Sequence, residues 1–224
     1  MTGSGPRALV ANRRAVVFDL DGTLIDSERA ICEAASLAFS AIGQPVTPLQ
    51  VADHLGAPLD ELYVLFVGDG DAARRARFVA QYIAHHDAHD ERFPPPLPGV
   101  LEALTLLRAR ALPLAVATTK PSDRARAQLE GAGLLALFQH VQGTDRGMQP
   151  KPAPDVVLAA CAALGVSPAA VLMVGDTPRD VGAARAAGAG AVVVAYSADR
   201  AVAARAFRAD AVVRSLMELL EPAR

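Results

Sequence analysis

The chain has 224 residues, of which 52% are hydrophobic and 4% aromatic, and its formal net charge is −2. It is long and apolar enough for one large domain, or for one domain with a smaller insert. Without a basic excess or an apolar run of membrane-span length, we expect no nucleic-acid partner and no membrane partner. The first fourteen residues hold no apolar secretion-signal segment, so we expect a cytoplasmic protein.

The first third of the chain changes character after one short strand. The apolar run 15–20 predicts a buried strand, and Asp19 and Asp21 stand at its end. Helical patterns follow, with Ser27 as the expected N-cap of the first helix and Gly43 as its stop. The expected helices are 27–42, 48–55, 59–67 and 72–90, and the proline-rich stretch 93–99 then predicts a rigid linker.

After the linker, short apolar strands alternate with helices. The expected strands are 114–117, 138–143, 171–174, 191–195 and 211–213, and the expected helices are 100–110, 122–131, 154–164, 178–187 and 201–207. This order predicts an α/β fold with a Rossmann-like, mainly parallel sheet that is covered on both faces. We therefore expect a catalytic core of residues 1–25 and 98–224, with residues 26–97 inserted as a helical cap.

Polar side chains gather where the predicted strands end, and ligand sites of open α/β sheets lie beyond those ends. The residues concerned are Asp19, Asp21, Thr118, Thr119, Lys120, Asp176 and Asp180, and Lys151 stands in a proline-stiffened loop, 150–155, before a helix. If the loops converge, several carboxylates meet with hydroxyl and ammonium donors. Carboxylate oxygens suit Mg²⁺, and a carboxylate can also attack phosphorus.

These residues resemble the four motifs of the haloacid dehalogenase-like superfamily. The matching segments are Asp19-Leu20-Asp21-Gly22-Thr23, Thr118, Lys151 and Gly175-Asp176-Thr177-Pro178-Arg179-Asp180, in the family's order. The stretches 24–27, 98–100 and 118–121 are similar to the phosphoglycolate phosphatase-like subgroup, which has a helical C1 cap. Thr119 departs from that subgroup, where asparagine is common.

The resemblance implies an activity and a role for each matching residue. It implies a Mg²⁺-dependent phosphatase that hydrolyses a small phosphate ester such as 2-phosphoglycolate through an aspartyl-phosphate, as a monomer or homodimer. Asp19 would be the nucleophile, and Asp21 the general acid and base. The metal would be held by Asp19, the Asp21 carbonyl, Asp176 and Asp180, and the phosphoryl group by Gly22, Thr118, Thr119 and Lys151.

Other functions remain open at this point. A phosphosugar mutase of the β-phosphoglucomutase type would use the same acids, although Ala57 stands after Gly56 where such enzymes usually place arginine. A non-catalytic binding protein could retain the fold. Dehalogenation is disfavoured by Asp21, and phosphonate hydrolysis by an insert without lysine.

Several residues also have purely structural explanations. Asp180 could be a first-turn acid favoured by the helix dipole, and Lys120 a solvated lysine. We expect Cys32 and Cys161 to be lone buried thiols. Within the insert, we expect Arg74, Arg75 and Arg77 to form a solvated face. We expect His85, His86 and His89 to be solvated or packed within the helices.

Overall fold

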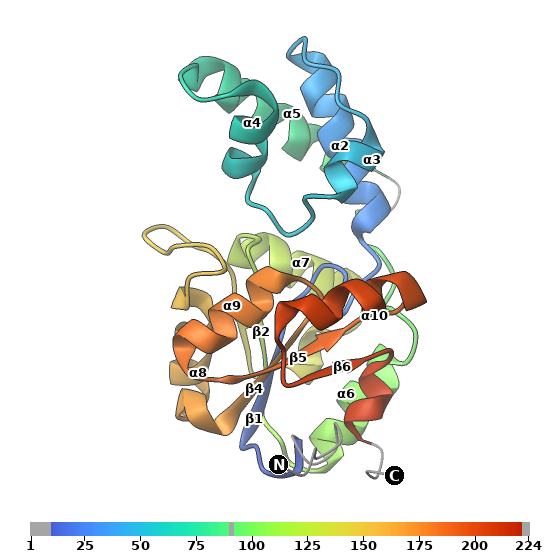
Figure 1. Cartoon of the computed structure of the whole chain (residues 1–224), viewed down its shortest axis with the longest axis vertical. Coiled ribbons are helices and arrows are strands. Elements are labelled where there is room, and N and C mark those ends of the chain that lie inside the picture. Colours follow the sequence, from blue (N-terminus) through green and yellow to red (C-terminus); the bar gives the residue numbers. More distant parts are fainter. Residues whose placement is uncertain (1–9, 90–91, 221–224) are drawn as a thin grey trace. The chain divides into compact units, whose positions relative to one another are not determined.

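The computed structural model describes residues 10–89 and 92–220, and the chain divides into two compact units (Figure 1). The first comprises Met1–Ile25 and Pro95–Arg224, and the second comprises Asp26–Pro94. The expected N-terminal stretch before residue 10 and the expected helix end at Asp90 lie outside the described residues. No helix in the described ranges is long and apolar enough to cross a bilayer.

The first unit is built on a parallel sheet, which has six strands within the described residues. The strands are β1 (Ala15–Phe18), β2 (Leu114–Ala117), β3 (His140–Gln142), β4 (Val171–Gly175), β5 (Gly190–Val194) and β6 (Ala211–Val213). Their order is β3-β2-β1-β4-β5-β6, and every neighbouring pair is parallel. This is the Rossmann-like order, which reverses direction between β1 and β4 and opens a ligand crevice there. The predicted α/β fold class is confirmed.

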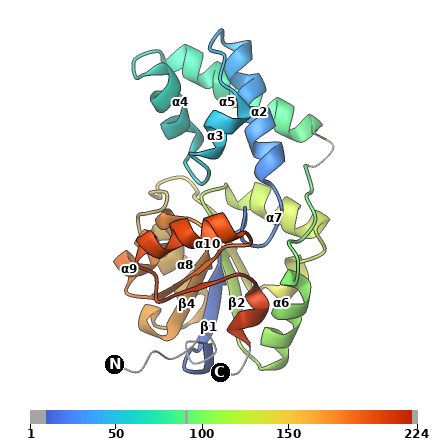
Figure 2. The same ribbon diagram turned by 45° about the vertical axis from the view of Figure 1, so that its right-hand side comes forward.

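The sheet is covered on both faces, and its strands β1, β2, β4 and β5 are buried at every position. All four residues of β1 are inaccessible to solvent. Val16 and Phe18 pack toward α6 (Val100–Ala109) and α7 (Ser122–Gly131). The alternate residues Ala15 and Val17 pack toward α8 (Asp155–Leu164), α9 (Pro178–Ala187) and α10 (Ala198–Ala204). Figure 2 shows α6 and α7 on one side of the sheet and α8 and α9 on the other.

Three local expectations need correction. Ser27 precedes the first helix of the insert, but its side chain accepts no capping hydrogen bond. Strand β3 is shorter than the expected 138–143, because Phe138 follows a 3-10 turn (Leu135–Leu137) and meets Phe18 edge to face at 6.3 Å. Helix α10 begins earlier than residue 201, because Ser197 caps it by accepting the Arg200 amide at 3.3 Å.

The second unit consists of four helices in the described residues. They are α2 (Glu28–Ala41), α3 (Pro48–Ala52), α4 (Leu59–Val67) and α5 (Ala72–Ala88). The rings of Phe39 and Phe78 stack at 4.3 Å between α2 and α5, and buried Tyr63 packs against Phe78. The unit therefore has its own apolar core.

The basic face of α5 is only partly solvated: Arg77 is exposed as expected, whereas Arg74 and Arg75 are half-buried. Arg74 donates from Nε and Nη2 to the Ile42 carbonyl at 3.2 and 3.0 Å, and Arg77 donates to the Ala41 carbonyl at 3.3 Å. Carbonyls at a helix C-terminus have no intrahelical partner, so these arginines complete the end of α2. The histidines pack within the helices as expected, since His86 is buried and His89 contacts Glu33 at 2.9 Å.

The two cysteines are free and buried, as expected. Cys161 lies in the core under α8 and Cys32 lies in the core of the helical unit. Burial raises the pKa of the Cys161 thiol, which favours its neutral form.

Candidate active site

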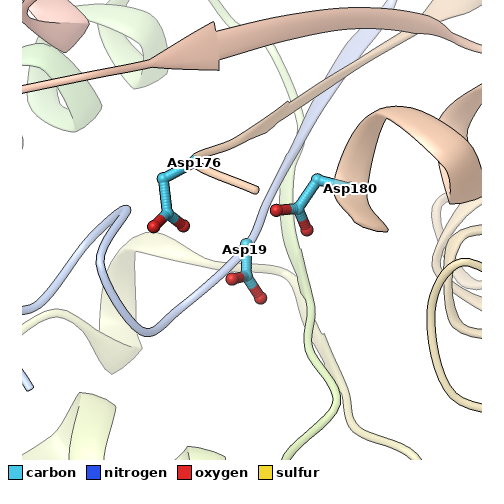
Figure 3. A group of neighbouring side chains, drawn as sticks. All are labelled: Asp19, Asp176 and Asp180. Carbon is cyan, nitrogen blue, oxygen red and sulfur yellow. The ribbon is translucent and has the colours of Figure 1, made fainter. Parts of the chain in front are cut away.

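Three carboxylates meet at the point where the strand order reverses. Asp19 follows β1, Asp176 follows β4, and Asp180 lies in the first turn of α9, as Figure 3 shows. One oxygen of each lies within 4.8 Å of the others. Phe18 pairs with Val174, and the Asp19 amide donates to the Val174 carbonyl at 2.9 Å, so the two strand ends are in register. The register of the sheet therefore brings together residues 157 positions apart.

Lys151 compensates this negative charge from within the protein. Its Nζ donates to Asp19 Oδ1 at 2.6 Å, to Asp180 Oδ1 at 2.5 Å and to the Ala117 carbonyl at 3.1 Å. Lys151 is only 2% exposed. Burial lowers the pKa of Lys151, but Asp180 and Asp19 outweigh burial, so the net pKa is raised and the ammonium form is held.

The nucleophile candidate Asp19 is strongly desolvated. It is 6% exposed, and burial raises the pKa of its carboxyl group to about 7, against the opposing effect of Lys151. Asp180 adds to this rise because it is a second negative charge close by. Without a further cation, the cluster therefore holds more carboxylate than one ammonium can neutralise.

Asp176 is held by residues that the sequence did not single out. Thr23 Oγ1 donates to Asp176 Oδ1 at 2.9 Å, and the Tyr196 hydroxyl donates to the Thr23 carbonyl at 2.8 Å. Arg200 Nη1 lies 3.7 Å from Asp176 Oδ2. Burial, and then Asp180 and Asp19, raise the pKa of Asp176 well above its usual range. Thr23 stands inside the first motif, which is the one signal that could have revealed its role.

Asp180 serves two purposes at once. Its Oδ2 accepts the Thr177 amide at 3.0 Å and the Thr177 hydroxyl at 2.7 Å, which fixes the start of α9. Its Oδ1 accepts from Lys151. The structural explanation therefore applies, but the same side chain also belongs to the acid cluster.

Asp21 lies beside Lys120, the other lysine of the chain. Lys120 Nζ donates to Asp21 Oδ1 at 2.9 Å and to Gln128 Oε1 on α7. The Lys120 side chain is 10% exposed, so of the two alternatives left open for Lys120 the solvated one is wrong. Lys120 was already a strand-end candidate, whereas Gln128 is a functional candidate that the sequence did not single out.

The predicted phosphoryl-binding residues lie on loops at the same strand ends. Thr118 is buried, its amide donates to the Gln142 carbonyl at 3.0 Å, and its Oγ1 accepts the Lys120 amide at 3.3 Å. Thr119 is half-buried between them. Gly22 has φ +75°, and a Cβ there would lie 2.5 Å from Asp176 Oδ2.

Gly22→Ala is expected to lower the free energy of unfolding by about 3 kcal/mol or more, because it adds left-handed strain and forces Asp176 to move. Gly43→Ala is the matched control. Gly43 has φ +74°, no described atom lies within 4 Å of its added Cβ, and strain alone costs about 1 kcal/mol. Urea unfolding measures both variants, and equal losses would show that the contact with Asp176 carries no cost.

The donor set fits a divalent cation with hard-ligand preference. Three carboxylates converge, two of them with pKa values raised by burial, and a cation would favour their charged forms. The buried ammonium, the Thr118 hydroxyl and loop amides are donors suited to an anionic group. The fold and site thus define an α/β enzyme that handles anionic substrates at its strand ends.

Comparison with known proteins places this enzyme in a family. The chain matches the haloacid dehalogenase-like hydrolase family over residues 16–194, and it belongs to that family. Phosphoglycolate phosphatase from Thiobacillus denitrificans is 34% identical and covers 92% of this chain and 93% of its own length. Phosphoglycolate phosphatase from Chromobacterium violaceum is 36% identical and covers 93% and 95%.

A solved structure extends the comparison. A HAD family hydrolase from Deinococcus radiodurans, with bound phosphate and sodium, aligns with a TM-score of 0.71 at 26% identity and covers 95% of this chain and 100% of its own. Within the family, the chain is a phosphoric monoester hydrolase of the phosphoglycolate phosphatase-like group.

Proposed function

We propose that this phosphatase is Mg²⁺-dependent and hydrolyses a small phosphorylated metabolite, 2-phosphoglycolate first among candidates, through an aspartyl-phosphate at Asp19. One observation carries the proposal: the buried Asp19 carboxylate contacts Lys151 and has Asp176 and Asp180 within 4.8 Å. Such a group can act as a nucleophile only where cations offset its own charge and that of the phosphoryl group.

Four groups of this chain are assigned to the metal. They are the Asp19 and Asp176 carboxylates and the Asp21 backbone carbonyl, with Asp180 as a supporting residue. Both Asp180 oxygens already accept hydrogen bonds from Lys151 or Thr177, which favours support over direct ligation. When bound, Mg²⁺ would supply charge neutralisation to the transferred phosphoryl group.

The protein's own residues account for two displacement steps. Asp19 attacks phosphorus, the bond to the ester oxygen breaks, and Asp21 gives that oxygen its proton. Asp21 then takes a proton from water as the water attacks phosphorus, which releases phosphate and restores Asp19. Lys151 neutralises charge on Asp19 and on the phosphoryl oxygens, while Thr118, Thr119 and the Gly22 loop donate hydrogen bonds to those oxygens.

The substrate proposal comes from the relatives. The Thiobacillus and Chromobacterium proteins carry the name phosphoglycolate phosphatase, and the Deinococcus structure holds phosphate. We assign the helical segment, residues 26–97, the role of a cap that selects the leaving group. A monomer or homodimer remains the expected assembly.

A phosphate-release screen across phosphorylated metabolites, with Mg²⁺ and with EDTA, tests the function. The expected result is release from 2-phosphoglycolate that EDTA abolishes and Mg²⁺ restores. Release that EDTA leaves intact would contradict the metal role. Formation of an isomeric phosphosugar without free phosphate would indicate a mutase.

Mg²⁺ affinity is expected to rise with pH up to at least about pH 7. Mg²⁺ needs ionised carboxylates, and the pKa of Asp19 is raised to about 7, so below that value a proton must leave before Mg²⁺ binds. Because the pKa of Asp176 is raised as well, displacement of at least one proton predicts an affinity gain of about tenfold or more per pH unit between about pH 5 and 7. Calorimetric titration measures it, with Asp176→Asn as the control that weakens binding throughout. Equal affinity at both ends of the range would contradict the expectation.

A further inference from the structure

Lysine is used very sparingly in this chain. Of its 22 basic residues, only Lys120 and Lys151 are lysines, and the others are arginines. Lys120 follows the end of β2 and Lys151 lies in the loop before α8, and both donate to carboxylates of the candidate active site. A compact ammonium differs from a planar guanidinium in size and geometry. Lys120 and Lys151 are thus the two positions at which this arginine-rich chain has a compact ammonium group and not a guanidinium.

The backbone of Lys120 is fixed by its neighbours. Its amide donates to Thr118 Oγ1 at 3.3 Å, and its carbonyl accepts the Thr144 amide at 3.1 Å. A Cβ on Gly143 would lie 2.2 Å from that carbonyl, so only glycine lets the two loops approach this closely. The Lys120 side chain therefore starts from a rigid loop.

The side chain of Lys120 is fixed at its far end as well. Nζ donates to Asp21 Oδ1 at 2.9 Å and to the Oε1 atom of Gln128, which is 3% exposed on α7. A buried amide that accepts from an ammonium directs it without neutralising its charge. Lys120 thus reaches Asp21 from a defined direction.

We propose that Lys120 is a positioning residue that orients the Asp21 carboxylate for proton transfer to the leaving group, and that Gln128 positions Lys120. The inference rests on the proposed function, because it takes Asp21 as the general acid and base. Lys120 holds Oδ1 and thereby sets the rotation of the carboxylate, which decides where Oδ2 presents its proton. Proton transfer depends steeply on such geometry.

The test compares leaving groups that need a proton with one that does not. The kcat/KM value reports the steps up to departure of the leaving group. Ethyl phosphate and 2-phosphoglycolate expel basic alkoxides that need protonation, whereas p-nitrophenyl phosphate expels a stable anion. We expect Lys120→Met to lower kcat/KM about 10- to 100-fold for both alkyl esters and less than about threefold for the nitrophenyl ester.

Four companion variants sharpen the comparison. Gln128→Leu should give the same pattern at smaller amplitude, and Lys120→Arg should restore part of the loss. Arg126→Met is the matched control, because Arg126 is an exposed cation on α7, the helix that carries Gln128. It should leave kcat/KM unchanged for the alkyl esters and for the nitrophenyl ester. Asp21→Asn should lower kcat/KM for the alkyl esters, relative to the nitrophenyl ester, more than any other variant. Thermal unfolding confirms that each variant is folded.

Each outcome decides the proposal. Equal loss for all three esters on Lys120→Met would overturn it, as a general structural defect would produce that pattern. Loss confined to 2-phosphoglycolate would also overturn it, because Lys120 would then bind the substrate carboxylate. If Asp21→Asn itself shows no leaving-group dependence, the proposed role of Asp21 fails. If Asp21→Asn shows the leaving-group dependence and Lys120→Met does not, the proposed role of Asp21 stands and only the positioning role of Lys120 fails.

Discussion

Asp19→Asn is expected to abolish phosphate release, by a factor on the order of 10⁴ or more, because an amide cannot form the acyl phosphate. The protein should stay folded and should not lose stability. Asp19 is 6% exposed and its pKa is raised by burial, so its charge is disfavoured where it stands. Steady-state release from 2-phosphoglycolate and thermal unfolding measure the two effects.

Asp26→Asn is the control for this change. Asp26 stands seven residues later, is exposed, and lies outside the acid cluster of Asp19, Asp176 and Asp180. It should keep near-normal turnover. Acid-quenched wild-type enzyme should carry a phosphoryl group on the peptide with Asp19, and Asp19→Asn should carry none. Turnover by Asp19→Asn at the wild-type rate would refute the nucleophile assignment.

Lys151→Met is expected to reduce the free energy of unfolding by about 3–5 kcal/mol at neutral to mildly alkaline pH, because it leaves two buried carboxylates uncompensated. Lys151 donates to both Asp19 and Asp180 at 2.6 and 2.5 Å. Without the ammonium, the pKa of Asp19 rises further, because Lys151 is what opposes the effect of burial there. An acid with a raised folded pKa destabilises the protein progressively as pH increases. The loss should therefore be smaller near pH 5 than near pH 8.

Urea unfolding at both pH values measures the effect. Lys120→Met is the matched control, because Lys120 pairs with one carboxylate and is more exposed, so it should cost less. The double variant Lys151→Met/Asp180→Asn should recover part of the loss, since it removes one of the stranded charges. A pH-independent loss would show that packing, not charge, is the role of Lys151.

The arrangement of the acids could be anticipated because local rules decide it. An apolar run followed by polar residues marks a strand end, and parallel strand ends share one edge of a sheet. This reasoning located Asp19 and Asp176 before any coordinates, whereas Lys151, on a loop, was identified through the family motif; the structure brings all three together. The α/β fold class followed from the same alternation of strands and helices.

Side-chain partners could not be anticipated in the same way. The sequence placed Lys120 at a strand end but left it either solvated or functional, because its direction depends on Gln128, which approaches on α7 from eight residues away. The arginines of α5 were expected in solvent, yet Arg74 and Arg77 complete the end of α2. Those contacts depend on how helices pack, which no local pattern encodes.

By itself, therefore, the sequence determined the class of fold and the strand-end location of the acids. These depend on periodicity and on residue chemistry, which act within a few neighbouring positions. Only the tertiary structure decided which polar and charged groups of the site pair with one another. It paired Lys151 with Asp19 and Asp180, Lys120 with Asp21, and Thr23 with Asp176. A buried charge is costly unless it has a partner, and these partners come from segments that are distant in the sequence. Which groups pair therefore depends on separations of a few ångströms that only the folded chain sets.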